Sequence, residues 1–373
     1  MNDTEDNQPL ILISSGGTGG HMTPAAALAH DLSDRGNRLE LVTDERGKKF
    51  AGMFPKDIPV HVIRAGTIGR GPAGKLKGAG NLAVGLLQAW NLVSRLEPDL
   101  VIGFGGYPSF PGVIAAQYQK IPTIIHEQNA IIGKANCYLA RGAERIALSF
   151  PEMRGLEKAE RMRSVITGNP VRAEIAALHK QPYPKPEPEG PVNLLVMGGS
   201  LGAAVFSKVM PQTLAQLPVE YKKRLSVVQQ CRAEDLEMAR KAYEEAGIKA
   251  DLAAFYDDMA DRLAAAHLVI CRSGASTVAE VTSAGRPAIF VPYPHHKDQQ
   301  QKRNADHVAD GGGAWLMTEE GFTPEALLAR ITTFLQNPEV LRGAAEKCRA
   351  FGKPDAAHKL GNLVKSVVAG SGF

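Results

Sequence analysis

The sequence predicts an α/β protein of two similar domains, and three observations support this. Short apolar runs such as LILIS and PDLVIGF alternate with segments of helical period, as in parallel sheets with crossover helices. The 373 residues exceed one ordinary core and suit two. The strand, glycine turn and helix that open the chain return in VNLLVMGGSLGAAVFSKV. We therefore expect two Rossmann-like domains facing each other across a cleft, where the carboxyl ends of both sheets converge.

The domain boundaries are expected at residues 1–172, 173–340 and 341–373, the last being a helical tail that packs back on the first domain. The segment QPYPKPEPEGP, residues 181–191, carries five prolines in eleven positions. Neither a helix nor an inner strand tolerates that density of proline. We interpret the segment as a stiff connector between the domains.

Composition excludes several classes of function. A formal net charge of +4 is mild for this length and does not indicate a nucleic-acid partner. The four cysteines show no CxxC spacing, which argues against a zinc site or a disulfide framework. The polar start MNDTEDNQ is not a signal peptide, and no apolar run reaches the length of a membrane span. The protein is expected in the cytoplasm or on a membrane face.

The first glycine-rich turn, GGTGGH, leads from a strand to a helix in which Pro24 suits the first turn. Its backbone amides would face an anion or a phosphate group. Met22 stands where the dinucleotide fingerprint requires its third glycine. Asp44 follows the next strand and suits a ribose contact, so an NAD-dependent oxidoreductase remains an alternative.

The second half raises two alternatives of its own. GGSLG fits the nucleophile motif of hydrolases with Ser200 at its centre, although a single hydrolase sheet does not explain the earlier twin loop. In CRSGASTVAEV, Thr277 and Glu280 have capping-box spacing. Glu280 is therefore either a helix cap or a carboxylate that accepts hydrogen bonds from the hydroxyls of a ribose.

Polar sets follow other strands in the same way, notably HEQN at 126–129 and PYPHHKDQQQKRNA after 291, and GFGGYPSFP forms a third glycine-rich loop. Such sets suit sugar hydroxyls better than a core. No DxD triplet occurs, so the usual metal clamp for a nucleotide diphosphate is missing. Helix amino ends and basic side chains must then stabilise the negative charge of the leaving diphosphate.

Together these loops resemble the MurG family of cell-wall glycosyltransferases. GGTGGH, GFGGYPSFP, HEQN, GNPVR, GGSLGA, CRSGASTVAE and HKDQQQ occur in the family's order from about residue 9 onward. The family moves N-acetylglucosamine from UDP-N-acetylglucosamine to lipid I, the undecaprenyl-linked muramyl-pentapeptide, and so forms lipid II. The resemblance implies a GT-B fold, inversion at the anomeric carbon, no cofactor and no catalytic metal.

The resemblance also implies roles for individual residues. The first domain would take the acceptor on its glycine loops, and the second would bind the UDP-sugar. Arg172 and Ser200 would hold the diphosphate, the backbone of Tyr256 would meet uracil, and Glu280 would bind the ribose. The other expected substrate-binding residues are Thr18, Gly19, Gly20, Asn129, Ala275, Ser276, Thr277, Val278, Ala279 and Gln301.

His21 is the expected catalytic residue. The attacking muramyl 4-hydroxyl must lose a proton, and a neutral imidazole is well suited to accept it near pH 7. The alternative is that His21 supports the loop or the acceptor through a hydrogen bond. The competing enzyme class is a UDP-sugar epimerase of similar shape, and the competing non-enzyme is a two-domain binding module.

A membrane partner is expected from residues 64–95. This segment combines Arg70, Lys75 and Lys77 with four large apolar side chains, a pairing that suits anionic lipid surfaces. The apolar residues are Leu82, Leu86, Leu87 and Trp90. The alternative is an ordinary amphipathic helix that packs on the core. We expect a peripheral protein on the cytoplasmic face of the membrane; the sequence defines no oligomeric state.

Overall fold

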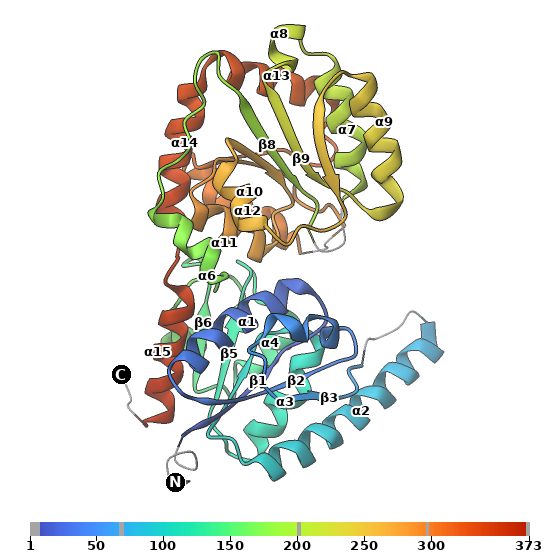
Figure 1. Ribbon diagram of the computed structural model, residues 1–373. Helices are drawn as coiled ribbons and strands as arrows, with labels where there is room; N and C mark the ends of the chain where they lie inside the picture. The colour runs from blue at the N-terminus through green and yellow to red at the C-terminus, as the bar shows by residue number, and fades with distance from the viewer. Residues whose placement is uncertain (1–7, 67–70, 200–202, 296–297, 371–373) are drawn as a thin grey trace. The chain divides into compact units, whose positions relative to one another are not determined.

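The computed structural model describes residues 8–66, 71–199, 203–295 and 298–370 (Figure 1). The chain divides into two compact units. The first unit runs to Arg172 and takes up the chain again from Asp355, and the second unit covers Ala173–Pro354.

The first unit is built on a parallel sheet in the order β3-β2-β1-β4-β5-β6-β7. The strands are β1 Leu10–Ser14, β2 Arg38–Thr43, β3 Val60–Val62, β4 Leu100–Gly103, β5 Thr123–Glu127, β6 Arg145–Leu148 and β7 Ser164–Ile166. The chain order reverses between β1 and β4, and such a switch point is where open α/β sheets bind ligands.

Helices cover both faces of this sheet because its strands alternate their side chains. Leu12 packs in the cluster that α2 and α3 complete, while Ile11 and Ile13 pack with α1 and the carboxyl-terminal helix on the other face. The helices are α1 Gly19–Asp34, η1 Gly47–Met53, α2 Gly71–Leu96, α3 Gly106–Tyr118, α4 Lys134–Leu139, α5 Lys158–Met162 and α15 Ala356–Val368.

The second unit repeats the arrangement with a parallel sheet in the order β10-β9-β8-β11-β12-β13. Its strands are β8 Val192–Met197, β9 Leu225–Gln230, β10 Lys249–Ala253, β11 Leu268–Cys271, β12 Ala288–Phe290 and β13 Ala314–Leu316. Its helices are α6 Ala173–Ala177, η2 Leu178–Lys180, α7 Ala204–Ala215, α8 Val219–Lys222, η3 Ala233–Asp235, α9 Leu236–Glu245, α10 Met259–Ala265, α11 Ala275–Ala284, α12 Gln300–Asp310, α13 Pro324–Gln336 and α14 Pro338–Phe351.

The proline-rich segment 181–191 is part of the second unit, so its interpretation as a connector between domains was wrong. The Tyr183 hydroxyl donates a hydrogen bond of 2.8 Å to the His267 carbonyl, and Arg224 Nε donates one of 2.9 Å to the Gly190 carbonyl. Proline excludes helix and inner strand, but an extended chain can still pack on a folded unit. The chain passes between the units at 172–173 and again at 354–355.

The expected start of the tail at residue 341 was also wrong, because α14 belongs to the second unit. Its Leu341 and Cys348 are buried, and Cys348 Sγ donates to the Arg286 carbonyl at 3.1 Å. Helix α15, by contrast, belongs to the first unit. Arg35, the C-cap of α1, donates to Asn362 Oδ1 at 2.7 Å and to the His358 carbonyl at 2.9 Å, and Leu360 enters the core beside them.

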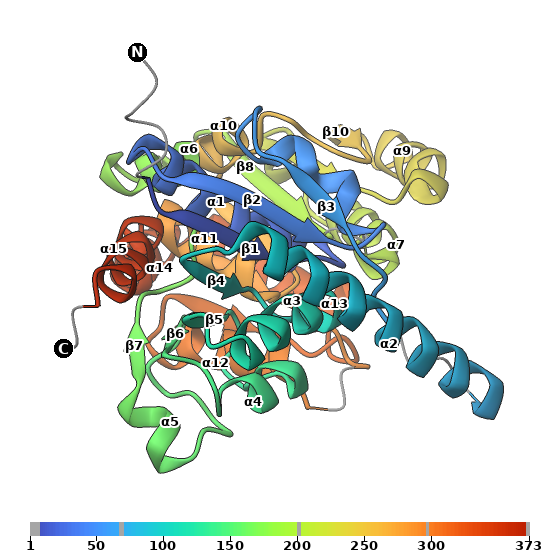
Figure 2. The same ribbon diagram turned by 90° about the horizontal axis from the view of Figure 1, so that it is seen from below.

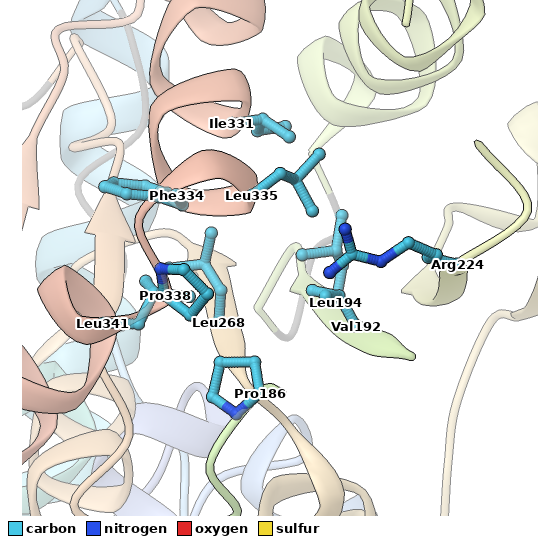
Figure 3. A pocket seen from close by; sticks show the side chains of 10 residues that line it. All are labelled: Pro186, Val192, Leu194, Arg224, Leu268, Ile331, Phe334, Leu335, Pro338 and Leu341. Carbon is cyan, nitrogen blue, oxygen red and sulfur yellow. The ribbon is translucent and has the colours of Figure 1, made fainter. Parts of the chain in front are cut away.

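Figure 3 shows a small apolar hollow at the amino ends of β8 and β11, lined by Pro186, Val192, Leu268 and Leu341 among others. Ligands of open α/β sheets bind at the opposite, carboxyl ends of the strands. This hollow is therefore a packing gap between the sheet, the proline-rich segment, α13 and α14.

Candidate functional site

Three connections of the first unit bring His21, Gly106 and Gln128 together. They follow β1, β4 and β5, which are neighbours in the sheet, so their carboxyl ends share one edge. A Cβ added to Gly106 would lie 3.3 Å from both Cδ2 and Nε2 of the His21 ring. Gly106 has a φ of +75° and Gly105 a φ of +80°, a region that favours glycine. The glycines thus let the loop after β4 approach the imidazole.

His21 lies in the first turn of α1. The Thr18 carbonyl accepts the amides of His21 at 3.1 Å and Met22 at 3.2 Å, so the helix begins at Gly19. Pro24 is its sixth residue, and the expectation that Pro24 marks the first turn was wrong. Thr18, Gly19 and Gly20 surround this helix start, where anions are favoured.

A chain of hydrogen bonds runs inward from His21. Its Nδ1 lies 3.0 Å from Gln128 Oε1, and Gln128 Nε2 lies 3.0 Å from His126 Nδ1. Gln128 Nε2 also donates to the His126 carbonyl at 3.1 Å, and His126 Nε2 lies 3.0 Å from the Gly168 carbonyl. His126 and Gln128 are both buried. Burial lowers the pKa of His126 to about 4, so its ring is neutral near pH 7.

Asp44 holds the glycine-rich loop in place. Its Oδ1 accepts the amides of Gly17 and Gly47, both at 2.9 Å, and its Oδ2 accepts Arg46 Nε at 3.0 Å. The carboxylate is thereby committed to the backbone of this loop. The ribose contact that kept an NAD-dependent oxidoreductase open has no support in this arrangement.

Glu127 organises the loop after β5. Its Oε1 accepts the backbone amide of Asn129 at 3.0 Å and the Asn129 side chain at 3.2 Å. Its Oε2 accepts the Gly133 amide at 2.9 Å and Asn136 Nδ2 at 2.8 Å. Asn129 is therefore held at the same sheet edge as His21, with an amide already oriented by a buried carboxylate.

In the second unit, the loops after β8 and β11 occupy the corresponding switch point. Ser200 lies outside the described residues. Helix α11 begins at Ala275, with Gly274 as its N-cap, so Ser276, Thr277, Val278 and Ala279 follow in the first turns. Glu280 is the sixth residue of the helix and is half-buried. The capping interpretation of Thr277 and Glu280 is wrong, because Thr277 lies inside the helix.

Arg272 anchors this edge of the second sheet, a role that the sequence analysis missed. Its Nη1 donates to the carbonyls of Val291 at 3.1 Å and Pro292 at 3.2 Å, and its Nη2 pairs with Glu319. The loop after β12 is held there too, because Gln301 Oε1 accepts the Tyr293 amide at 2.9 Å. Gln301, the second residue of α12, thus accepts a backbone hydrogen bond from this loop.

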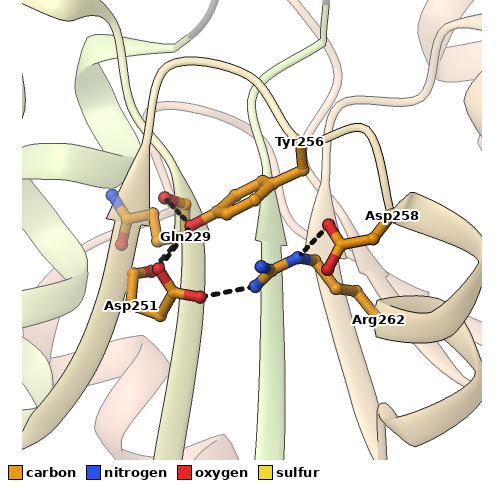
Figure 4. Close-up of polar contacts among 5 residues, drawn as sticks. All are labelled: Gln229, Asp251, Tyr256, Asp258 and Arg262. Atoms are coloured by element: carbon orange, nitrogen blue, oxygen red, sulfur yellow. Dashed lines mark hydrogen bonds and ion pairs between the residues drawn. The ribbon is translucent and has the colours of Figure 1, made fainter.

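Tyr256 is anchored by its side chain (Figure 4). Its hydroxyl donates to the Asp251 carbonyl at 2.8 Å, and the Arg262 guanidinium lies 3.8 Å from its ring centroid. Arg262 is paired in turn with Asp251 at 2.6 Å and Asp258 at 2.7 Å. Burial raises the pKa of the Tyr256 phenol well above its usual range. The backbone of this loop is therefore firmly held at the carboxyl end of β10.

Arg172 is the last residue of the first unit before the chain passes into the second unit.

Within the described residues, no group of three or more His, Cys, Asp or Glu side chains could hold a metal ion. The same part of the chain contains no helix long and apolar enough to cross a membrane.

Comparisons with known proteins decide the family. Residues 11–148 match the glycosyltransferase family 28 N-terminal domain, and residues 193–360 match the C-terminal domain of that family. The UDP-N-acetylglucosamine–N-acetylmuramyl-(pentapeptide) pyrophosphoryl-undecaprenol N-acetylglucosamine transferase of Rhodospirillum centenum is 52% identical over 95% of this chain and 93% of its own length. The chain belongs to the MurG family.

Solved structures agree with this assignment. Acinetobacter baumannii MurG is similar with a TM-score of 0.77 and 31% identity, covering 96% of this chain and 99% of its own. The UDP-N-acetylglucosamine 2-epimerase of Neisseria meningitidis covers 97% and 100% with a TM-score of 0.66 but is only 14% identical, which shows a shared fold alone. The GT-B fold expected from the resemblance is confirmed, and the epimerase alternative gains no support beyond shape.

Proposed function

We propose that the chain transfers N-acetylglucosamine from UDP-N-acetylglucosamine to the 4-hydroxyl of lipid I, with inversion, and so forms lipid II. The observation that carries this proposal is the near-full-length match to the Rhodospirillum centenum transferase, whose name states this reaction. The match spans both glycosyltransferase domains. The arrangement around His21 supports it, because one ring nitrogen is held by Gln128 while the other faces the glycine loop.

In the proposed reaction, His21 Nε2 takes the proton of the 4-hydroxyl as that oxygen attacks the anomeric carbon. The new bond joins the oxygen to the anomeric carbon, and the bond from that carbon to the diphosphate breaks, which releases UDP. A positioned base of this kind contributes about 10² to 10⁴-fold to a rate. Gln128 Oε1 lies where it stabilises the imidazolium that forms.

The acceptor is proposed to bind the first unit. The amides around Gly105 and Gly106 begin α3, and those around Gly19 and Gly20 begin α1. Two helix amino ends at one sheet edge suit the diphosphate of lipid I. Asn129, held by Glu127, would contact a sugar.

The donor is proposed to bind the second unit. Glu280 on α11 would accept hydrogen bonds from the ribose, and Ala275 and Ser276 lie at the start of the same helix. The diphosphate contacts of Arg172 and Ser200 stay predictions. The Gln301 side chain would bind sugar hydroxyls, while its oxygen also accepts the Tyr293 amide. The backbone of Tyr256 would meet uracil, in a loop that Arg262 and Asp251 hold in place.

A membrane surface is proposed as a further partner, through α2. Figure 2 shows the amino-terminal turns of this helix extending beyond the rest of its unit. Leu76, Leu87 and Trp90 are exposed on it, while Leu86 packs against the core. The side chains of Lys75 and Lys77 and the whole of Arg70 lie outside the described residues. The helix would bind anionic lipid on the cytoplasmic face, where lipid II formation serves cell-wall synthesis, cell shape and division.

One incubation tests the proposed function. Purified protein receives labelled UDP-N-acetylglucosamine with and without lipid I, and the products are separated. Label that enters the lipid only when lipid I is present supports the proposal; an altered UDP-sugar formed without lipid would support an epimerase instead. Metal independence stays a prediction, based on the missing DxD triplet. Excess chelator in the same assay tests it, because a loss restored by magnesium would contradict it.

A further inference from the structure

We propose that Gln128 is a positioning residue that holds the neutral His21 ring as its Nδ1–H tautomer and leaves Nε2 unprotonated. The inference deepens the proposed function, on which its importance for turnover rests. The tautomer itself is a property of the free protein. The tautomer follows from three constraints on the hydrogen bonds that link the buried His126 to His21.

The first constraint is the orientation of the Gln128 amide. Its nitrogen lies 3.1 Å from the His126 carbonyl, which can only accept a hydrogen bond. Turning the amide over would place two oxygens against each other inside the protein, where an unmade hydrogen bond is costly. The nitrogen therefore faces His126, and Oε1 must face His21.

The second constraint comes from His126 and points the same way. Its Nε2 lies 3.0 Å from the Gly168 carbonyl, another group that only accepts, so Nε2 carries the proton. Burial keeps the ring neutral by lowering its pKa to about 4. Nδ1 of His126 is then an acceptor, and it takes the second hydrogen of the Gln128 amide at 3.0 Å.

The third constraint is at His21 itself. Gln128 Oε1 has no hydrogen to give, so the contact of 3.0 Å requires a proton on His21 Nδ1. In the neutral ring the lone pair is then on Nε2, the atom 3.3 Å from the position of an added Gly106 Cβ. A free histidine side chain in water favours the opposite tautomer, with its proton on Nε2. The Gly168 carbonyl, His126 and Gln128 thus reverse that preference and direct a basic nitrogen toward the glycine loop.

The tautomer can be measured in the wild-type chain without substrate. The protein is labelled with ¹⁵N in the histidine rings, and a His21→Asn variant assigns the His21 signals among the ten histidines. In the neutral ring, we expect Nε2 to resonate as an unprotonated nitrogen and Nδ1 as a protonated one. A protonated Nε2 in neutral His21 overturns the inference.

Two matched variants separate positioning from general stability. Gln128→Met removes the acceptor, so we expect His21 to shift toward the Nε2–H tautomer and kcat to fall by about 10- to 100-fold, with the KM for the donor nearly unchanged. Gln117→Met removes comparable hydrogen bonds in the same unit, those to Thr123 Oγ1 at 3.2 Å and the Leu139 carbonyl at 2.9 Å. The Gln117→Met variant should change neither the tautomer of His21 nor kcat.

The outcomes distinguish this inference from the proposed function. A Gln128→Met protein that folds and keeps both the wild-type tautomer and kcat overturns the positioning role. Should Gln128→Met fail to fold, the wild-type spectrum still decides the tautomer. A wild-type protein that transfers no sugar contradicts the proposed function alone, because the spectrum is recorded without either substrate.

Discussion

The imidazole of His21 and the side-chain amide of Gln128 meet at 3.0 Å between Nδ1 and Oε1, although 107 residues separate them in the chain. The contact joins α1, which follows β1, to the loop after β5. Gly106, at the start of the helix that follows the intervening β4, lies against the same ring. The sheet topology thus assembles a supported imidazole at the switch point of the first unit.

Gly106→Ala should disturb this imidazole. The new Cβ would face Nε2 of His21 at 3.3 Å, in a backbone with a φ of +75°. We expect a stability loss of about 1 to 3 kcal/mol from the backbone and a fall in kcat of roughly 10- to 100-fold from the displaced ring. Gly80→Ala in α2 is the control, since an added Cβ there meets nothing within 4 Å. A Gly106→Ala enzyme with wild-type turnover would show that this approach is unimportant.

Glu280→Ala should weaken donor binding without unfolding the protein. Glu280 lies in the second turn of α11 and does not cap it. We expect a loss of roughly 1.5 to 3 kcal/mol in the binding of the donor, the scale of hydrogen bonds to a charged group. Calorimetric titration with UDP-N-acetylglucosamine measures it.

Glu160→Ala provides the contrast for this prediction. Its carboxylate accepts the Glu157 amide at 2.7 Å in the capping box of α5. This variant should lose about 0.5 to 2 kcal/mol of stability and keep donor affinity. If Glu280→Ala lowers the melting temperature steeply and binds the donor normally, the ribose role of Glu280 is wrong.

His126 should make the first unit sensitive to acid. Its pKa is about 4 in the folded chain against an ordinary value of 6.5, so the unfolded chain binds the proton first as the pH falls. Stability is therefore complete above about pH 6.5 and declines toward pH 4, by up to roughly 3 kcal/mol from this group. Denaturant unfolding of wild type and His126→Gln across this range measures the slope. His30→Gln removes an exposed histidine as a control, and equal slopes in all three proteins would contradict the prediction.

Helix α2 should carry the attachment to lipid. Leu87 and Trp90 are 68% and 45% exposed, so Leu87→Ser with Trp90→Ser should weaken sedimentation with anionic vesicles. Lys75→Glu with Lys77→Glu should weaken the salt-sensitive part of binding. Met162→Ser is the control, because Met162 is an 81% exposed apolar residue on α5 of the same unit. Unchanged binding of both double variants would exclude this role of α2.

Much of the fold could be predicted from the sequence because buried parallel strands consist of short runs of apolar residues. LILIS, for example, became β1 with every residue buried. The proline-rich segment could not be placed, since proline content reports which regular elements are excluded and not what an extended chain packs against. Likewise, the spacing of Thr277 and Glu280 is compatible with a cap, but the helix begins two residues earlier at Ala275.

The motifs predicted which segments form the site, but not which of their side chains contact each other. The HEQN motif marked the right strand end, yet only Asn129 was selected from it, and the partners of His21 in the same motif were missed. Their role depends on which loops the sheet order brings together, and motif spacing does not contain that order. Arg272 was missed for a similar reason, because its partners Val291 and Glu319 come from later segments of the chain.

The role of His21 as the base is tested by kcat as a function of pH for the wild type and His21→Ala, with both substrates saturating. If Nε2 of His21 takes the proton, the variant should lose about 10² to 10⁴-fold in kcat together with the acidic limb of the profile, while donor affinity stays nearly unchanged. A variant that keeps near-normal turnover, or that retains the wild-type acidic limb, would show that His21 is not the base.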